Sequence, residues 1–168
     1  MAYKIDVSII VRNHLKTLTN DNKNAKRDYR DIIIFGVVPI VTSWGLIIKD
    51  IFISKDLVGA IISGLAVYVG LSLNLIILLF EIVQKKETSP FKKDFAKDFI
   101  ANVCFSVLLS IAVIFSVLLT LIGDPKNPSE HWILTLTNGI CFFMLIHMLL
   151  LVLMLIKRLY YQLIEQVG

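Results

Sequence analysis

Charged residues are scarce in this chain of 168 residues. They make up 18% of it, against 57% for hydrophobic residues, and the mean hydropathy is +0.78. Soluble domains hold about 25% charged and about 45–50% apolar residues. A disordered chain has few apolar residues and many charges, which is the opposite composition. The composition therefore excludes disorder and an ordinary soluble enzyme, and it favours a protein embedded in a membrane.

Cysteine is also rare, and familiar catalytic patterns are missing. The two cysteines, Cys104 and Cys141, are too few for a disulfide scaffold. They lie at different depths of the spans predicted below, which argues against a disulfide between them. The sequence has no phosphate-binding glycine loop, no His-Glu-x-x-His pattern and no nucleophile elbow. We therefore expect no enzymatic activity, no catalytic residue, no cofactor and no bound metal.

Lys, Arg, Asp and Glu are absent from four stretches of the chain. A bilayer core of about 30 Å needs about 20 apolar residues in a helix, and residues 57–80, 99–122 and 132–156 each exceed this length. Residues 32–48 form a minimal fourth stretch that contains Pro39, and a buried core helix is its alternative interpretation. Continuous apolar runs exclude the alternating pattern of a membrane barrel. We therefore predict an all-α polytopic membrane protein, a bundle of four transmembrane helices.

The orientation follows from Lys and Arg in the segments between the spans. Seven lie in residues 1–31, five in the loop 81–98 and two in the tail 157–168, against three on the other side. Such an excess marks the cytoplasmic side of a membrane protein. We therefore predict that both termini lie in the cytoplasm and that the protein resides in a bacterial inner (plasma) membrane.

The segment before the first span has a helical pattern of its own. Between residues 4 and 18, apolar side chains recur on one helical face, namely Val7, Ile10, Val11, Leu15 and Leu18. Residues 3–10 also alternate as in a strand, which is the other interpretation. We predict an amphipathic helix here. The chain then divides into a cytoplasmic juxtamembrane segment (1–30), a transmembrane domain (31–156) and a cytoplasmic tail (157–168).

The cations on the predicted cytoplasmic side have two interpretations. They set the topology and touch anionic lipid of the cytoplasmic leaflet, or they form a docking face for an acidic cytosolic protein. We favour the first, because orientation alone requires such charge. No nucleic-acid-binding module is recognisable, so we expect no direct nucleic-acid partner. The candidate docking residues are Lys23, Lys26, Arg27, Arg30, Lys92, Lys93, Lys97, Lys157 and Arg158.

Two predicted spans carry small or polar residues along one side. In residues 57–80 they are Gly59, Ser63, Ala66, Gly70 and Asn74, and in residues 99–122 they are Asn102, Ser106, Ser110, Ser116 and Thr120. Small residues let helix backbones approach closely, and polar ones hydrogen-bond between helices. We favour packing within one chain. A subunit interface, which would make a homo-oligomer, and a pore lining remain open.

His147 is the one ionisable side chain deep within a predicted span. Such residues are costly in lipid and are candidates for function. A neutral histidine paired with a neighbouring Ser, Thr or Asn is the interpretation that we favour. Gating or proton sensing is the alternative.

Two stretches carry a resemblance to a known group of proteins. They are Lys97-Asp98-Phe99-Ile100-Ala101-Asn102-Val103-Cys104-Phe105, and His147 with Leu153-Met154-Leu155-Ile156-Lys157-Arg158-Leu159-Tyr160. They resemble small bacterial four-span proteins of phage-defence islands, among which Kiwa-type membrane subunits occur. The matching polar positions are Asn102, His147 and Arg158. The resemblance implies an inner-membrane component that works with a cytosolic effector.

Two hypotheses of function follow. The first is a homo-oligomeric membrane subunit that senses membrane disturbance and holds a soluble partner. It is based on the inward-facing cations, the additional cytoplasmic helix and the short outer loops. The second is a channel-forming effector that depolarises the membrane, based on the polar line of residues 99–122 and on His147. We favour the first.

Overall fold

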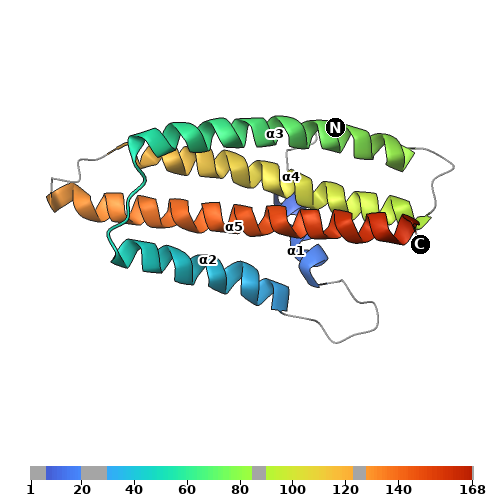
Figure 1. The fold of residues 1–168 in the computed structure, drawn as a ribbon, viewed down its shortest axis with the longest axis horizontal. Coiled ribbons are helices and arrows are strands. Elements are labelled where there is room, and N and C mark those ends of the chain that lie inside the picture. The colour runs from blue at the N-terminus through green and yellow to red at the C-terminus, as the bar shows by residue number, and fades with distance from the viewer. Residues whose placement is uncertain (1–6, 20–29, 85–89, 123–127, 168) are drawn as a thin grey trace.

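The structure is a computed structural model that describes residues 7–19, 30–84, 90–122 and 128–167 of the chain. Every regular element in these ranges is an α-helix (Figure 1), and the helices are α1 (Val7–Thr19), α2 (Arg30–Ile48), α3 (Lys55–Gln84), α4 (Pro90–Leu119) and α5 (Pro128–Val167). The predicted all-α class is therefore confirmed for the described residues.

Three helices are long and apolar enough to cross a membrane, as a multi-pass membrane protein requires. The apolar stretches are Lys55–Glu81 in α3, Phe95–Leu119 in α4 and His131–Tyr160 in α5. They correspond to the three long spans that the sequence predicts. The apolar part of α2, Ile33–Ile48, is shorter. Helices α3 and α5 extend beyond the predicted spans at both ends, because helical hydrogen bonds continue outside the apolar stretches. Helix α4 begins before its predicted span, at Pro90, but ends at Leu119, short of the predicted end at residue 122.

The four longer helices, which the sequence predicts to form a bundle, are arranged as an open row. Helix α3 packs on α4, α4 on α5 and α5 on α2, so that α2 and α3 lie at opposite edges (Figure 1). Neighbours in the row run antiparallel. Lipid tails are as apolar as leucine side chains, so no hydrophobic force closes such a row in a membrane.

Two sets of hydrogen bonds, a helix cap and a contact with α5, hold the link between α2 and α3. Asp50, with a φ of 51°, takes the left-handed position that follows a helix, and Ile51 N–H donates to the carbonyl of Leu46 (3.1 Å), as in a Schellman cap. The amide oxygen of buried Asn138 in α5 then accepts a hydrogen bond from Ile53 N–H (2.9 Å). The second contact attaches the link between α2 and α3 to α5 at one end of the row.

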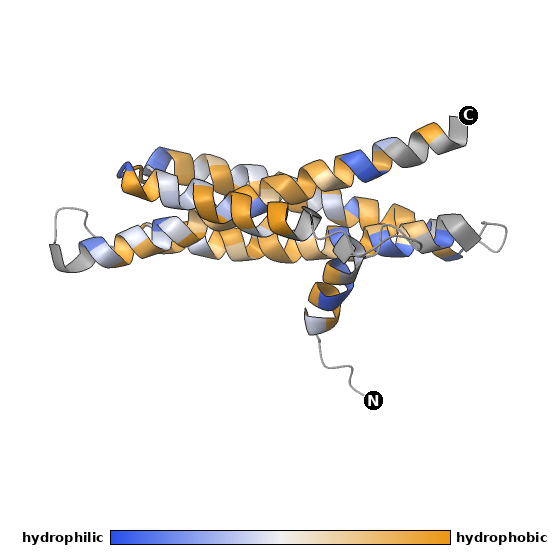
Figure 2. Ribbon diagram, turned by 90° about the horizontal axis from the view of Figure 1, so that it is seen from below, coloured by the Kyte–Doolittle hydropathy of each residue, from blue (hydrophilic) through white to orange (hydrophobic). Residues whose placement is uncertain are grey.

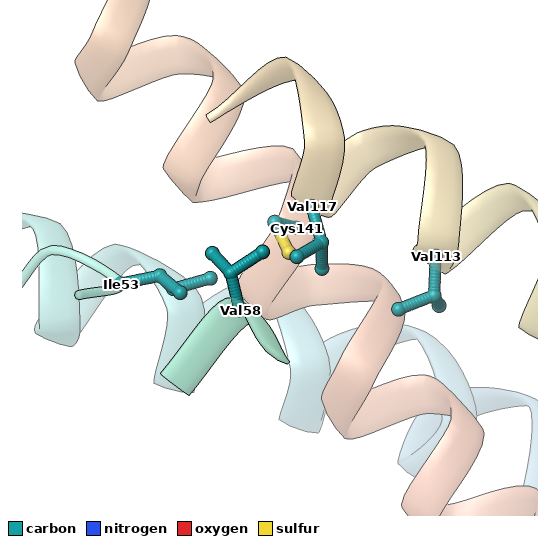
Figure 3. Close-up of a cluster of buried hydrophobic side chains, with 5 residues drawn as sticks. All are labelled: Ile53, Val58, Val113, Val117 and Cys141. Carbon is teal, nitrogen blue, oxygen red and sulfur yellow. The ribbon is translucent and has the colours of Figure 1, made fainter. Parts of the chain in front are cut away.

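The buried apolar side chains gather where neighbouring helices meet. One cluster brings together side chains from the link, α3, α4 and α5 (Figure 3), namely Ile53, Val58, Val113, Val117 and Cys141. A second lies between α3, α4 and α5 at the other end of the row, around Phe99 and Leu155. A third joins Phe35 of α2 to Leu151 of α5. Helices α4 and α5 are therefore the interior of the row.

Helix α1 stands apart from this arrangement. Its axis is steeply inclined to those of the long helices, and the beginning of α1 projects away from the row (Figure 2); it packs mainly on α4. Its place is near the level at which α2 begins (Figure 1). The predicted N-terminal helix is therefore present, and the contact that it makes with the row is the polar site described next.

Candidate functional site

The contact between α1 and α4 is made by buried polar side chains. Nδ1 of His14 donates a hydrogen bond to Oδ1 of Asn102 (2.7 Å), and the hydroxyl of Thr17 lies 2.8 Å from the same oxygen. His14 is 1% exposed and Asn102 is fully buried. A polar group loses its hydration when it is buried, so it must find such partners inside the protein. These bonds therefore fix both the place and the rotation of α1.

Helix α5 closes this contact with a cation. Nη2 of Arg158 donates to the backbone carbonyl of Thr17 (2.8 Å), which lies in the last turn of α1. Carbonyl groups at the end of a helix lack partners within the helix and carry its negative dipole end. A guanidinium at this place satisfies one of them. His14, Thr17, Asn102 and Arg158 together are called the His14 cluster below.

Aromatic rings extend the His14 cluster to α2. The ring of His14 stacks on Phe105 with centroids 4.0 Å apart, and His147 meets Phe105 edge-on at 6.3 Å. Nδ1 of His147 donates to the backbone carbonyl of Phe35 in α2 (3.0 Å). The structure therefore brings His147 together with Asn102 and Arg158, the three polar positions of the resemblance, around one chain of contacts. The partner of His147 is a backbone carbonyl and not the Ser, Thr or Asn that we expected.

The His14 cluster is incompletely satisfied. Nδ2 of Asn102 is buried and has no hydrogen-bond partner in the described part of the chain. The single hydroxyl hydrogen of Thr17 faces two acceptors, the carbonyl of His14 (2.7 Å) and Oδ1 of Asn102. An unsatisfied buried donor costs about 1–3 kcal/mol. The docking of α1 is therefore specific in geometry but carries a built-in penalty.

Burial keeps His14 neutral. It lowers the pKa of His14 from 6.5 to about 4, an effect that the hydrogen bond to Asn102 opposes and that the charges of His147 and Arg158 reinforce. Above pH 6.5, the imidazole can remain docked without carrying a charge into the protein. The His14 cluster therefore combines one neutral imidazole with one guanidinium.

The His14 cluster holds α1 against α4 and α5. Among the described residues, no three His, Cys, Asp or Glu side chains are grouped so that they could hold a metal ion. A groove of about 230 Å³ lies between α3 and α5, with an almost wholly apolar lining. The hydroxyl of Tyr68 in its wall is turned to Ser106 (2.8 Å). A site for a polar molecule needs several converging polar groups, which this groove lacks.

The polar line of α4 faces the interior of the row. Asn102, Ser106, Ser110, Ser116 and Thr120 are all buried. Ser106 donates to the carbonyl of Val103 (2.7 Å), and Ser110 donates to that of Ser106 (2.8 Å). The structure thus uses these five residues, called the α4 line below, for packing within the chain.

The small-residue stripe of α3 faces outward. Gly59, Ser63, Ala66, Gly70 and Asn74, called the α3 stripe below, are all exposed. A Cβ atom added at Gly59 or Gly70 would meet nothing within 4 Å. Packing within one chain, which we favoured for this stripe, is therefore not what the structure shows. The physical reason is that α3 lies at the edge of the row and packs on α4 with its other side.

The candidate docking cations fall into three groups. Lys97 and Lys157 are exposed, and Lys93 is half-buried. Arg158 is half-buried and binds α1, so it belongs to the site and not to an open docking face. Lys23, Lys26 and Arg27 lie outside the described residues, as do the side chains of Arg30 and Lys92.

Sequence reasoning missed two residues of the site, His14 and Thr17. Their spacing of three places them on one helical face, but the apolar residues beside them suggested a different face for packing. Asn102 was found because a polar residue stands out in an apolar span, whereas Arg158 was named as one of the cations of the predicted cytoplasmic tail. His14 and Thr17 lie on a helix outside the spans, where polar residues are common, so nothing in the sequence marked them as buried.

Comparison of the chain with models of protein families, with curated proteins and with solved structures finds no match. The fold and the site define the class of protein. It is an all-helical chain, in its described residues, with three helices able to cross a membrane and a transverse N-terminal helix bound to them by a buried polar cluster.

Proposed function

We propose that this chain is a non-enzymatic subunit of a bacterial inner membrane that self-associates, senses membrane disturbance and anchors a cytosolic effector. The setting is antiphage defence, as in the proteins that it resembles. The observation that carries self-association is the outward position of the α3 stripe in an apolar helix. The next paragraphs give the support for each part.

The proposed topology has four spans with both termini in the cytoplasm. The apolar part of α2, Ile33–Ile48, is about 24 Å long at 1.5 Å per residue, and thinning of the bilayer or snorkelling of flanking residues accommodates such a length. Helix α2 also packs on α5, one of the three longer apolar helices. The excess of Lys and Arg in residues 1–31, 81–98 and 157–168 orients the spans.

Asn74 supports self-association through α3. Its side chain is exposed on an apolar helix and makes no hydrogen bond to the described residues. Facing lipid, an amide without partners is costly, whereas two amides can satisfy each other because each has a donor and an acceptor. Gly59 and Gly70 would let a second α3 approach closely enough for this pairing.

Exposed cations support an acidic cytosolic effector as the partner. Lys97 lies near the start of α4 and Lys157 near the end of α5, at the same end of the antiparallel pair. Helix α5 continues from there to Val167. A helical extension with exposed cations beside it offers a surface outside the bilayer to a negatively charged protein.

The channel hypothesis has less support than the membrane subunit, because contacts within one chain account for the residues on which it is based. The α4 line is buried within one chain, and His147 is engaged with Phe35. Only Ser63 and Asn74 of the exposed α3 stripe carry polar side chains, which is a sparse lining for a pore. We therefore retain the membrane subunit as the proposal.

A matched pair of glycine variants tests self-association. Gly64 is exposed like Gly70, has the same open space around it, and lies about 120° away around the helix. We expect Gly70→Leu to dissociate the oligomer in lipid nanodiscs, as measured by single-molecule mass, and Gly64→Leu to leave it intact. A wild-type chain that is monomeric in nanodiscs, or equal effects of the two variants, would refute the interface.

A further inference from the structure

Helix α1 docks through its polar side and exposes much of its apolar side. Among the described side chains of α1, those turned to the row are His14, Thr17 and, half-buried, Ile10. The side chain of Leu18, also part of the predicted apolar face, lies outside the described ones. Val7, Val11 and Leu15 of the predicted apolar face are exposed, Leu15 to 51%. The predicted amphipathic pattern is present, but the side of α1 that packs on the protein is not the apolar side. The two sides lie next to each other around the helix.

The helix has three sides that differ in chemistry. At about 100° per residue, Val7, Val11 and Leu15 form one flank, called the α1 flank, beside the docked side. Arg12 lies further around and is exposed. Ile9 is also exposed and lies nearly opposite Val11. The His14 cluster fixes the rotation of the helix, so the α1 flank points in one constant direction.

The level of α1 along the row is that of one end of the spans. Thr17 binds Arg158, which lies two residues before the end of the apolar stretch His131–Tyr160. His14 binds Asn102, about 10 Å along the helix from the first residue of the stretch Phe95–Leu119. Because the axis of α1 is steeply inclined to those of the long helices (Figure 2), it would run along the boundary between lipid and water in a membrane that the long helices cross.

We infer that α1 is an interfacial helix whose flank Val7, Val11 and Leu15 inserts into the cytoplasmic lipid leaflet. A helix parallel to the membrane places its apolar side at the boundary of headgroups and acyl chains and its cations toward the headgroups, and Arg12 is an exposed cation beside the α1 flank. The inference rests on the membrane setting and orientation of the proposed function. It does not depend on self-association or on an effector.

This position would couple the leaflet to the protein. The α1 flank and the docked side belong to one short helix, so a change in lipid packing that moves the flank acts on the bonds of His14 and Thr17 to Asn102. Nδ2 of Asn102 is buried without a hydrogen-bond partner among the described residues. Because this unsatisfied donor lowers the net stability of the contact, α1 separates from α4 at a smaller cost in free energy. Helix α1 is thus the element through which the proposed sensing would begin.

Fluorescence quenching at two matched positions tests the inference. In the full chain with Cys104→Ala and Cys141→Ala, one cysteine is introduced by Val11→Cys or by Ile9→Cys and labelled with an environment-sensitive dye. The protein is reconstituted in vesicles of phosphatidylcholine and phosphatidylglycerol, with or without bromine on the acyl chains. We expect brominated chains to quench the dye at position 11 several-fold more than at position 9, and aqueous iodide to show the reverse order.

The outcomes separate lipid from the other possible partners. Equal quenching at both positions, or a dye at position 11 that iodide reaches freely, would overturn the inference. A dye at position 11 that neither quencher reaches would show that protein covers the flank, which also overturns it. Repeating the measurement with Gly70→Leu keeps this test independent of self-association. His14→Ala should reduce the difference between the two positions, because the rotation of α1 is then no longer fixed.

Discussion

The α3 stripe and the α4 line have similar residues and opposite positions. Both repeat small or polar side chains along one side of an apolar helix, yet the α4 line is buried and the α3 stripe is exposed. In lipid, a polar or small face is not driven inward by the hydrophobic effect. Its position is decided by the partners available, and α4 has neighbours on both sides in the row whereas α3 has one.

The hydrogen bonds of the α4 line show what such partners are. Tyr68 of α3 donates to Ser106 (2.8 Å), His14 of α1 donates to Asn102, and Ser110 lies against the sulfur of Met148 in α5 (3.7 Å). Side chains from three other helices, α1, α3 and α5, thus contact the α4 line. The α3 stripe has no such role in one chain, so its use would require a second one.

The largest expected effect is a pH dependence of α1 docking. Docking uses the hydrogen bond from His14 to Asn102, the first residue of the α4 line. The pKa of His14 is lowered from 6.5 to about 4 in the docked state, so protonation favours the undocked state. Docking is therefore fully stable above pH 6.5, weakens as the pH falls towards 4, and loses at most about 3 kcal/mol. Hydrogen exchange of the α1 amides, corrected for intrinsic rates, measures this loss.

His14→Phe is the matched control for the pH dependence. It keeps a ring on Phe105 but cannot donate to Asn102 or become charged. We expect faster exchange of the α1 amides at pH 7 and a flat pH profile. A variant that retains the wild-type profile would show that another group titrates.

The second prediction tests whether the inner and outer positions differ in stability. Ser110→Leu inserts a large side chain at a fully buried position, and overpacking of this kind costs about 1–3 kcal/mol. Ser63→Leu makes the same change at an exposed position of α3 and should leave the stability of a single chain nearly unchanged. Unfolding in mixed micelles of SDS and mild detergent measures both. Equal losses would contradict the comparison.

The third prediction concerns the polar residue of the α3 stripe. Asn74→Leu removes the amide that we propose to pair with a second copy, and such hydrogen bonds contribute about 0.6–2 kcal/mol in membranes. Dimer formation in bilayers, followed by energy transfer between labelled chains, should weaken accordingly, whereas Asn74→Gln should retain most of it. Tighter association of the leucine variant would show that the contact is made by apolar packing instead.

The smallest expected effect is that of Arg158. Arg158→Ala removes the donor to the last turn of α1, and a cation at a helix terminus contributes about 0.3–1 kcal/mol. We expect a modest increase in hydrogen exchange at the end of α1, while the pH profile that His14 sets keeps its shape. If the profile disappeared instead, Arg158 and not His14 would control docking.

The sequence predicted the apolar helices but not how they are arranged. Spans 57–80, 99–122 and 132–156 were recognisable because a helix in lipid needs a long run without charge, whatever its neighbours are. The order of the row could not be predicted, since α3 and α4 each carry small or polar residues along one side, and this pattern fits either a buried or an exposed side. Asn102 stood out against an apolar background, whereas the role of His14 depended on a contact between residues 88 positions apart.

By itself, the sequence determined that this chain is helical and apolar over three membrane-length stretches, because backbone groups in lipid must be satisfied within each helix. Only the tertiary structure decided which sides of the helices are buried. Helix α1 docks by His14 and Thr17 instead of by its apolar flank, and α3 presents its small residues outward. The reason is that polar groups which find partners, and not apolar area alone, orient helices where the surroundings are themselves apolar.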